Sequence, residues 1–573
     1  MQKRWFVRTS MNSTTVEDFR STLKVDRIVA ELLLQREVDK FEDAEAFFRP
    51  KIEQLHDPFL MMDMEQAVLR VIKAIENKES IMLYGDYDVD GTTSVALMYS
   101  LLKDHLDDLS FYIPDRYQEG YGVSKKGVQS AIDQGVSLLI TLDCGIKANE
   151  QIEMARNGGI DVIVCDHHRP GDVLPKGIIL DPKRKDCAYP FKELSGCGVG
   201  FKLMQALYTR NNWSFDPLWN NLDLLAISIG ADLVEMTGEN RTLCSLGIKL
   251  LNESPRTAFK EMLLLANRTF PVSLTDVVFT IAPRINAAGR LRSGIHAVEL
   301  MISEDLDEIR TIAAEINEDN LERRELDKGI TKEALEQLAK EPESRSTNVV
   351  FDSDWHKGVV GIVASRIIEN HYKPTVVLTE SKGVITGSAR SVEGFDVHDA
   401  IAKCSSLIEQ FGGHKYAAGL TMKVENYEPF KRKFEEEVAK SIDPELLVPE
   451  QKVDIELDFN EIFTAEENRL KIPRLKRVLN QFEPHGPGNM KPVFLSKNVY
   501  STDVRLLKDA HLKISMTQPE HDVIMEGIGF NLASKIDDVS AGMPFDVVYT
   551  LEVNRWRNRE TIQLNIKDIR ASL

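Results

Sequence analysis

The sequence predicts a multidomain α/β protein, in which two α/β segments separated by one long helix precede a small β domain. Four short apolar runs alternate with helical stretches over residues 81–180, which is the pattern of parallel strands in a layered α/β fold. A polar segment over residues 303–341 has helical apolar spacing and is typical of a domain connector. From about Val453 onward, apolar and polar residues alternate, which favours a small barrel of half-buried strands.

Length and composition limit the classes to which the protein can belong. The 573 residues correspond to three to four domains at roughly 150 residues each. Six cysteines without a Cys-x-x-Cys pair exclude a disulfide scaffold and disfavour a zinc ribbon. No apolar run approaches the ~20 residues that span a bilayer, and no signal peptide is recognisable, so we expect a cytoplasmic protein without membrane contact. The lack of a Gly-x-x-x-x-Gly-Lys-[Ser/Thr] sequence argues against ATP-driven work.

The first α/β segment contains strand-like runs at residues 81–84, 136–142, 160–165 and 177–180. In an open parallel sheet, ligands bind beyond the carboxyl ends of the strands. Acidic residues stand at the ends of the first three runs: Asp86 after Gly85, Asp143 and Asp166. We therefore expect these three carboxylates to share one crevice.

The turn after the first run carries Asp86, Asp88 and Asp90 at alternate positions, followed by Gly91. Three carboxylates this close repel one another unless a cation neutralises them. A solvated acidic turn is the alternative interpretation. The start of an EF-hand is another, but it needs a glutamate about six residues after the glycine, and residues 95–98 supply none.

Further acids and two histidines extend this set of candidate ligands: Asp143, Asp166, His167, His168 and Asp232. Single members could be core or surface residues, but adjacent histidines after an aspartate are typical of a metal site. Carboxylates with imidazoles suit Mn²⁺, or Mg²⁺ with fewer nitrogen ligands. The set exceeds the need of one divalent ion, and a two-metal site activates a water against a phosphate. Hydrolysis of a phosphate ester is the predicted reaction class.

The connecting helix is predicted to begin at Ser303 as N-cap, with Glu304 and Asp305 in its first turn. Pro342 is predicted to end it. Gly329 weakens its middle, and a break into two helices there is an open alternative. A second α/β segment follows over about residues 348–439, with strand-like runs at 349–351 and 375–378.

The C-terminal segment indicates how a chain with a negative net charge can still bind nucleic acid. The 71 basic and 90 acidic residues give a net charge of −19, which argues against broad coating of nucleic acid. Residues 450–573, however, hold 19 acids and 17 bases. On a strand, Arg555, Arg557 and Arg559 would share one face around Trp556. Basic rows near aromatics fit tracking of a single strand, and a merely charged sheet face is the alternative.

The motifs, taken in order, resemble a known superfamily. Asp-x-Asp-x-Asp-Gly, Asp-Cys-Gly, Asp-His-His and Gly-Ala-Asp look like the four motifs of the DHH phosphoesterases. Four further stretches, at residues 281–290, 355–363, 387–390 and 411–419, closely resemble signatures of one member, the RecJ exonuclease family. The resemblance covers essentially the whole chain. It implies a 5′–3′ exonuclease for single-stranded DNA that uses two divalent ions, Mn²⁺ or Mg²⁺, in DNA repair and recombination.

The resemblance also implies a domain order and a set of site residues. The expected parts are an N-terminal helical extension at 1–70, a DHH catalytic domain at 71–302, the connecting helix at 303–342, a DHHA1-like nucleic-acid-binding domain at 343–447 and an OB-like domain at 448–573. The implied metal ligands are Asp86, Asp88, Asp90, Asp143, His167, His168 and Asp232, and Asp166 is expected to orient an imidazole as a further residue of the catalytic set. The implied nucleic-acid and phosphate contacts are Arg116, Arg284, Asn286, Arg290, His356, Ser388, Arg390, Gly412, Gly413 and His414, with Arg555, Trp556, Arg557 and Arg559 on the OB-like domain.

Two other functions are compatible with this superfamily. A phosphodiesterase for short oligonucleotides or cyclic dinucleotides usually lacks the added β domain and the stretch at residues 281–290. A non-catalytic replication scaffold on the same fold would lack motif acids, and none is missing here.

For the exonuclease, the expected partners are single-stranded DNA, single-strand-binding protein and a helicase.

Overall fold

The computed structural model describes residues 3–9, 12–463, 472–519, 522–540, 542–556 and 559–572. The chain forms two compact units. The larger unit consists of residues 5–286, 293–313 and 452–573, and the smaller unit mainly of residues 287–292 and 314–451. In the described part of the chain, no helix is both long enough and apolar enough to cross a membrane.

The N-terminal region begins with a strand, where the sequence predicts only helices. Strand β1 (Arg4–Val7) pairs with β12 (Glu450–Val453) in a two-stranded sheet. The aromatic and β-branched residues of Arg4-Trp5-Phe6-Val7 favour this extended form. The predicted helices follow as α1 (Ser13–Leu23), α2 (Arg27–Leu34) and α3 (Phe41–Phe48).

The predicted parallel sheet is confirmed, with one strand that the sequence pattern did not indicate. Its strands are β2 (Ile81–Gly85), β3 (Leu109–Tyr112), β4 (Leu138–Leu142), β5 (Asp161–Cys165) and β6 (Ile178–Leu180). They are all parallel and lie in the order β3-β2-β4-β5-β6. The four predicted runs are β2, β4, β5 and β6. The missed strand β3 is short, lies at the edge and is half-buried throughout, so it carries no clear apolar run.

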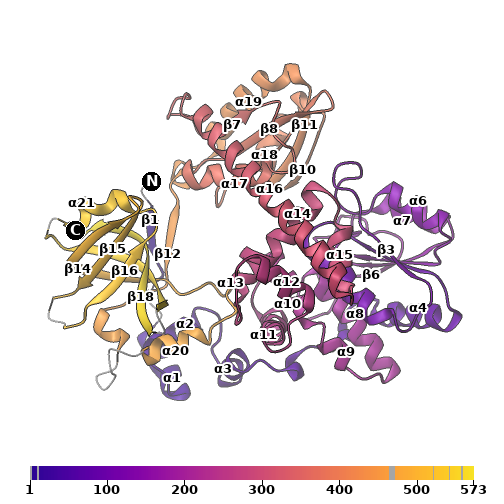
Figure 1. Ribbon diagram of the computed structural model, residues 1–573, viewed down its shortest axis with the longest axis horizontal. Helices are drawn as coiled ribbons and strands as arrows, with labels where there is room; N and C mark the ends of the chain where they lie inside the picture. Colours follow the sequence, from indigo (N-terminus) through magenta and orange to yellow (C-terminus); the bar gives the residue numbers. More distant parts are fainter. Residues whose placement is uncertain are drawn as a thin grey trace. The chain divides into compact units, whose positions relative to one another are not determined.

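Helices cover both faces of this sheet. They are α4 (Met64–Asn77), α5 (Val89–Leu102), α6 (Lys125–Asp133), α7 (Asn149–Asn157) and α8 (Gly196–Asn211). Helices α6 and α7 pack on one face, and α4 and α8 lie on the other (Figure 1). The strand order reverses direction between β2 and β4, so the carboxyl ends of these two strands flank the crevice where such sheets bind ligands.

A helical layer completes this part of the larger unit. It contains α9 (Asp216–Trp219), α10 (Leu222–Asp232), α11 (Gly238–Glu253), α12 (Thr257–Leu265), α13 (Leu274–Asp276), the π-helical turn η3 (Val277–Ile281), α14 (Ala282–Leu291) and α15 (Ile295–Ile302). Helix α10 is buried from Leu222 to Gly230 and packs against α5, α8 and α11. It is therefore a core helix whose last residue, Asp232, emerges at its end.

The long connecting helix is confirmed as α16 (Leu306–Leu338), but its predicted ends are wrong. Ser303 ends α15, and the carboxylate of Asp305 accepts hydrogen bonds from the backbone N–H groups of Asp307 and Glu308, so Asp305 begins α16. The helix stops before Pro342.

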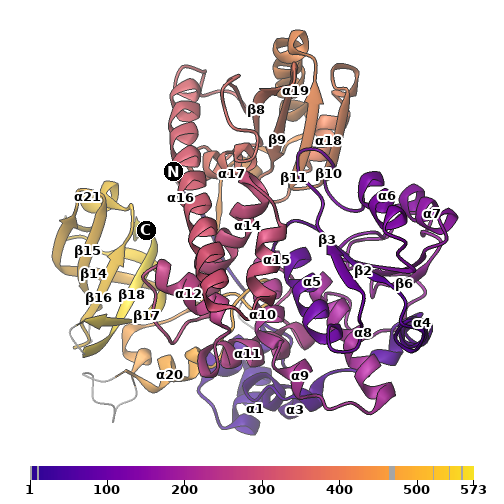
Figure 2. The same ribbon diagram turned by 45° about the vertical axis from the view of Figure 1, so that its right-hand side comes forward.

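The alternative of a break at Gly329 is also wrong, because α16 is one continuous helix (Figure 2). A Cβ at Gly329 would have no atom within 4 Å, so the residue lies on an open face where the missing side chain leaves no cavity. Residues on the other face of its C-terminal half, Ile330, Ala334 and Leu338, are buried in a core of the smaller unit. This packing stabilises the helix through the glycine.

The smaller unit is a second α/β layer, as predicted. Its elements are β7 (Asn348–Phe351), α17 (Val360–Asn370), β8 (Thr375–Ser381), β9 (Val384–Arg390), α18 (Val397–Ala402), β10 (Gln410–His414), β11 (Ala417–Met422) and α19 (Tyr427–Ser441). The sheet order is β10-β11-β9-β8-β7, with only β7 and β8 parallel.

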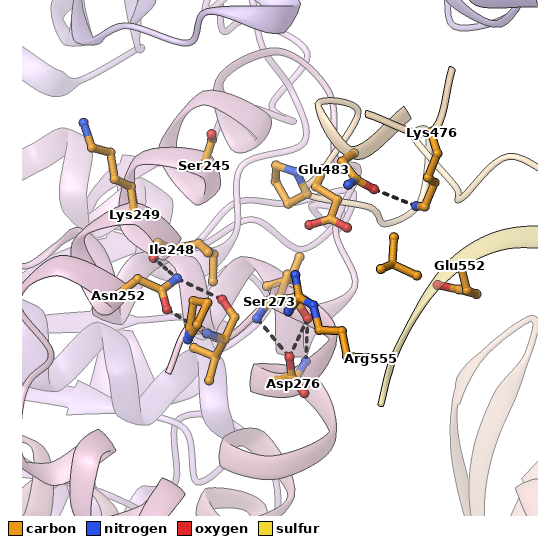
Figure 3. Close-up of a pocket in the computed structure, with 16 residues that line it drawn as sticks. Ser245, Ile248, Lys249, Asn252, Ser273, Asp276, Lys476, Glu483, Glu552 and Arg555 are labelled. Atoms are coloured by element: carbon orange, nitrogen blue, oxygen red, sulfur yellow. Dashed lines mark hydrogen bonds between the residues drawn. The ribbon is translucent and has the colours of Figure 1, made fainter. Parts of the chain in front are cut away.

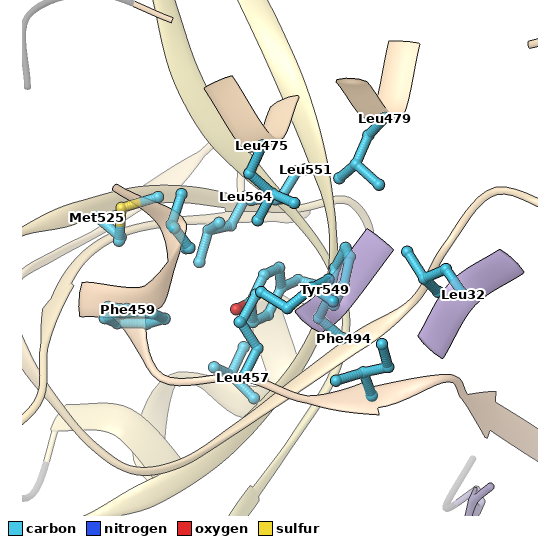
Figure 4. Packing of buried hydrophobic residues seen from close by; sticks show 14 of the residues in the cluster. Leu32, Leu457, Phe459, Leu475, Leu479, Phe494, Met525, Tyr549, Leu551 and Leu564 are labelled. Atoms are coloured by element: carbon cyan, nitrogen blue, oxygen red, sulfur yellow. The ribbon is translucent and has the colours of Figure 1, made fainter. Parts of the chain in front are cut away.

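The predicted C-terminal barrel is confirmed. Its elements are β13 (Ile455–Glu456), α20 (Arg474–Asn480), β14 (Phe494–Leu507), β15 (His511–Thr517), β16 (Met525–Gly529), α21 (Ile536–Ser540), β17 (Phe545–Trp556) and β18 (Arg559–Ala571). Strands β14, β15, β16, β18 and β17 follow one another, and β17 pairs back onto β14 to close the barrel. Figure 4 shows Leu32 of α2 and Leu475 and Leu479 of α20 beside the barrel core around Tyr549, so helices from two regions pack onto the barrel.

All six cysteines are buried and carry free thiols. Burial raises the pKa of most of these thiols, among them those of Cys144, Cys165 and Cys197, which lie beside the acidic motifs in sequence or in space. They are packing residues, as the sequence indicates for Cys144 and Cys165.

Candidate active site

The acidic motifs meet at the carboxyl end of the parallel sheet. Asp86 follows β2, Asp143 follows β4 and Asp166 follows β5, and these three strands are neighbours. Gly91 lets the first motif fold back on itself, because a Cβ there would lie 2.4 Å from the carbonyl oxygen of Asp86. The motif therefore brings its three aspartates to the point where the strand order reverses.

Asp88 and Asp90 have different local roles. Asp88 is the N-cap of α5, and its carboxylate accepts a hydrogen bond of 3.0 Å from Gly91 N. Asp90 accepts hydrogen bonds from Gly196 N (2.7 Å), Cys197 N (2.9 Å) and Ser228 Oγ (2.6 Å). Because these donors belong to α8 and α10, Asp90 joins three helices through one buried carboxylate.

His167 lies at the centre of the cluster and is buried. Its Nε2 is 3.2 Å from Asp143 Oδ1, 3.5 Å from Asp232 Oδ2 and 3.7 Å from Asp90 Oδ2. Two groups have ligand atoms within 4.8 Å of one another, namely Asp143 with His167 and His168, and Asp90 with His167 and Asp232. Two adjoining sets of oxygen and nitrogen donors therefore share one imidazole.

The cluster has the unsatisfied polar atoms that a cation would satisfy. Both carboxylate oxygens of Asp86, Asp143 Oδ1 and both ring nitrogens of His167 are buried and have no hydrogen-bonding partner among the residues that the structure describes. Burial, with repulsion from Asp88, raises the pKa of Asp86, and burial with repulsion from Asp90 raises that of Asp143. Burial and repulsion from Asp90 raise the pKa of Asp232 to about 8. These residues fit divalent cations, which would favour their ionised forms.

Asp166 holds His168, which belongs to the first of these two groups. Its carboxylate accepts hydrogen bonds from Ile146 N (2.9 Å), His167 N (2.7 Å) and His168 Nδ1 (2.8 Å). Burial alone would raise the pKa of Asp166, but the hydrogen bond and charge of His168 outweigh it and lower that pKa. Burial likewise opposes the charge of His168, but Asp166 raises the pKa of His168 to about 9. The contact fixes the orientation of the imidazole.

Sequence reasoning missed two neighbours of the cluster. Tyr121 Oη lies 3.1 Å from His168 Nε2, on the ring nitrogen opposite Asp166. The sequence does carry a signal for Tyr121, because a glycine stands on either side of it. Both glycines, Gly120 and Gly122, have positive φ. The hydroxyl of Ser228 on Asp90 carried no signal, because its position depends on the packing of α10 against α5.

Three predicted phosphate contacts lie in the larger unit. The Arg116 guanidinium lies 4.8 Å from the centre of the Tyr87 ring, within the first acidic motif. Arg284 is buried, and its Nη1 donates to Thr280 O at 2.7 Å in the π-helical turn. Asn286 lies half-buried on α14.

The smaller unit brings its predicted residues together across three strands. The register aligns Ser388 of β9 with Gly412 of β10 through Gly419, and Arg390 with His414 through Ala417. These residues therefore occupy two rows of one sheet, with the row of Ala389, Ala418 and Gly413 between them. Arg390 Nη1 donates to Ser388 Oγ at 2.8 Å.

The remaining predicted residues of the smaller unit lie near Gly358. Arg290 Nη1 donates to Gly358 O at 3.0 Å, and His356 Nδ1 accepts from Gly358 N at 3.2 Å.

Gly413 of β10 has a φ of +144°, a backbone conformation that only glycine adopts readily.

The barrel presents a mixed surface at its predicted basic row. Arg555 is exposed, and its Nε lies 2.9 Å from Glu560 Oε1. It lines a cavity of about 560 Å³ together with Lys249 and Lys476, but Glu483 and Glu552 line it as well (Figure 3). Arg559 begins β18, whereas Arg557 and the side chain of Trp556 lie outside the described residues.

Three family comparisons cover most of the chain. Residues 80–229 match the DHH family, N-terminal domain, residues 326–440 match the DHHA1 domain, and residues 453–568 match the RecJ OB domain. These stretches contain the parallel sheet, the second α/β layer and the barrel.

Relatives match over nearly the full length. The single-stranded-DNA-specific exonuclease RecJ of Bacillus subtilis is 37% identical over 97% of this chain and 70% of its own length. The protein of the same name from Escherichia coli is 33% identical over 88% of this chain and 90% of its own. A crystal structure of RecJ in complex with Mn²⁺ from Thermus thermophilus is similar over 100% of this chain and 80% of its own, with a TM-score of 0.84 and 27% identity. The Mg²⁺ complex has a TM-score of 0.79 at 25% identity.

Proposed function

Because the chain belongs to the RecJ family of single-stranded-DNA-specific exonucleases, we propose that it degrades single-stranded DNA from the 5′ end by hydrolysing phosphodiester bonds with two Mn²⁺ or Mg²⁺ ions. The observation that carries this proposal is the buried cluster of unpartnered carboxylate and imidazole atoms at the reversal point of the sheet. We assign the protein to DNA repair and recombination in the cytoplasm, with single-strand-binding protein and a helicase as partners.

Different residues and segments of the chain have different roles in this proposal. When bound, the ions supply an activated water and neutralise charge on the phosphoryl oxygens. Asp86, Asp88, Asp90, Asp143, His167, His168 and Asp232 hold the ions. Asp166 accepts a hydrogen bond from His168 Nδ1 and so fixes the orientation of this imidazole. We assign catalysis to residues 71–302, binding of the nucleic acid to residues 343–447 and additional grip to residues 448–573.

One assay distinguishes this function from its alternatives. Single strands labelled at the 5′ or the 3′ end, a duplex, and a cyclic dinucleotide are incubated with the protein and Mn²⁺. We expect release of the 5′ label first, slow attack on the duplex, and loss of cleavage after chelation of the metal. Earlier release of the 3′ label contradicts the polarity. Cleavage of the cyclic dinucleotide alone would favour the small-substrate phosphodiesterase.

Arg390→Ala tests how the 5′ end is recognised. Arg390, His414 and Arg116 are proposed to bind the terminal phosphate or its neighbour. Losing a charge-assisted hydrogen bond costs about 1.5–3 kcal/mol, so cleavage of a 5′-phosphorylated strand should fall roughly 10- to 100-fold. The preference for a 5′-phosphate over a 5′-hydroxyl should shrink, measured as the ratio of kcat/KM values.

The matched control is Arg432→Ala, which removes an exposed arginine from α19 of the same unit. It should retain both the activity and the preference. Equal loss in the two variants would mean that the unit responds to net charge and that Arg390 has no specific role.

The double variant Arg555→Ala/Arg559→Ala tests whether the barrel binds the phosphates of a long single strand. Each phosphate contact contributes about −0.7 to the salt slope of single-strand binding, so removing two should flatten the slope by about 1.4. Cleavage of long strands should weaken, while cleavage of a dinucleotide should barely change. The measurement is a salt series on both lengths. Arg505→Ala/Lys508→Ala removes the same charge around another hairpin and should keep the slope.

A further inference from the structure

The loop at residues 483–491 connects α20 to β14 and is held by two arginines of other elements, the buried Arg241 and the half-buried Arg36. Arg241 of α11 donates to the carbonyl oxygens of Phe482, Pro484, Gln481 and Phe47, at 3.1, 3.4, 3.2 and 3.0 Å. Arg36, which follows α2, donates from Nε to Asn489 Oδ1 at 2.8 Å and from Nη2 to Met490 O at 2.7 Å. Both ends of the loop are thus fixed to helices outside the barrel.

The loop also closes on itself. Asn489 is 1% exposed, and its Nδ2 donates to Phe482 O and Pro484 O at 2.8 and 2.9 Å. Asn489 N and Gly486 N each donate to the other residue's carbonyl oxygen. The Phe482 ring is buried against Phe47 and Phe48. These hydrogen bonds, together with the Phe482 ring in the core, fix the conformation of the loop.

The tip of this loop touches the segment that follows Asp232. Met236 N donates to Pro487 O at 2.6 Å. A Cβ at Gly486 would lie 3.1 Å from Met236 Cβ, and a Cβ at Gly488 would lie 2.8 Å from Thr237 Cγ2. The two glycines therefore allow the loop backbone to press directly on residues 236–237.

The Asp232 side chain is less enclosed by protein than those of Asp90 and Asp143, so the backbone next to it has a larger part in its orientation. Asp232 is the last residue of α10, and Leu233 turns the chain with a φ of 57°. The Asp232 side chain is 28% exposed, whereas those of Asp90 and Asp143 are 1% and 2% exposed. Asp90 is further fixed by three hydrogen bonds. Asp232 is therefore oriented mainly by the backbone on either side of it.

We infer that the 483–491 loop is a positioning element for the metal site, which holds Asp232 in place through residues 233–237. This inference rests on the proposed function, since it assigns Asp232 to metal binding. It gives the barrel side of the larger unit a second role beyond grip on DNA. Disturbing the loop should weaken metal binding and should slow cleavage of short and long strands by the same factor, unlike the loss of Arg555 and Arg559.

Gly488→Ala tests the inference. The added methyl must displace Thr237, whose β-branched side chain is stiff. Partners that orient metal ligands typically contribute 10- to 100-fold in metal affinity, so we expect Mn²⁺ affinity to fall about tenfold or more. The readout is the electron paramagnetic resonance signal of free Mn²⁺ during titration. kcat at low Mn²⁺ should fall equally on a dinucleotide and on a long strand.

Two further variants separate positioning from general damage. Gly542 also has positive φ, at +66°, but a Cβ there meets no atom within 4 Å, so Gly542→Ala carries the backbone strain alone and should bind Mn²⁺ like wild type. Thr237→Ser removes the clashing Cγ2, so Gly488→Ala/Thr237→Ser should regain at least half of the lost affinity on a logarithmic scale.

The outcomes are distinct. If Gly488→Ala binds Mn²⁺ as tightly as Gly542→Ala, or if Thr237→Ser restores nothing, the loop does not position Asp232. Wild-type protein and Asp232→Ala are titrated alongside. A wild type that neither binds Mn²⁺ nor cuts single strands contradicts the proposed function, whereas a competent wild type with an unaffected Gly488→Ala contradicts the role of the loop alone.

Discussion

Asp143→Ala is expected to abolish nuclease activity and to leave the fold intact. Asp143 Oδ1 is a buried oxygen without a hydrogen-bonding partner among the described residues, 3.2 Å from His167 Nε2, so the variant loses an atom that we propose to bind a metal ion. Metal ions contribute several kcal/mol to stabilisation of the transition state, which corresponds to a loss on the order of 10³-fold. The measurement is kcat/KM on a 5′-labelled single strand with saturating Mn²⁺. Activity within tenfold of wild type would contradict the two-metal interpretation.

The same variant should be at least as stable as wild type without metal. Burial and Asp90 raise the pKa of Asp143, so the folded state binds this proton more tightly than the unfolded state does. The metal-free fold therefore loses stability through Asp143 as the pH rises above the unfolded pKa of about 3.9. Thermal melting in chelator at pH 8 should show an equal or higher Tm for Asp143→Ala. A large drop in Tm would mean that Asp143 also has a structural role.

Asp90→Ala is expected to give the opposite result for stability. Asp90 accepts three hydrogen bonds from buried donors on α8 and α10, and all three donors lose their acceptor in the variant. Leaving a buried donor without its acceptor costs about 1–3 kcal/mol. The measurement is the midpoint of urea unfolding in chelator, compared with Asp143→Ala.

This pair of variants is matched, because the same side chain is removed from two neighbouring, equally buried positions. Asp88→Ala should fall between them, since the loss of an N-cap costs about 1 kcal/mol. Equal stability of Asp90→Ala and Asp143→Ala would mean that the helices are held together without the carboxylate of Asp90. All three variants should be inactive as nucleases.

The sequence was sufficient to predict the acidic crevice because it depends on local order. Each strand is a short apolar run, and the acid that follows it emerges at the same edge of a parallel sheet. The sequence did not predict the separate roles of Asp88 and Asp90. Whether an aspartate caps its own helix or joins three helices depends on Gly196 and Ser228, which lie more than a hundred residues away in the chain.

The errors have a similar origin. A break at Gly329 is reasonable for an isolated helix, but burial of Ile330 and Ala334 against the smaller unit's core overrides the weak propensity of one glycine. Contacts of the 483–491 loop were also invisible, because its glycines and prolines indicate a turn and say nothing about the partner that the turn meets.

The burial of all six thiols has a practical consequence for spectroscopy. A buried thiol is shielded from a maleimide, and where burial also raises its pKa, less of the reactive thiolate is present at neutral pH. A single cysteine introduced at an exposed position, such as Lys382 in the β8–β9 turn, would therefore take up a dye or spin label far faster than the native residues do. The wild-type sequence can then serve directly as the background for labelling, and the six native cysteines need not be replaced first.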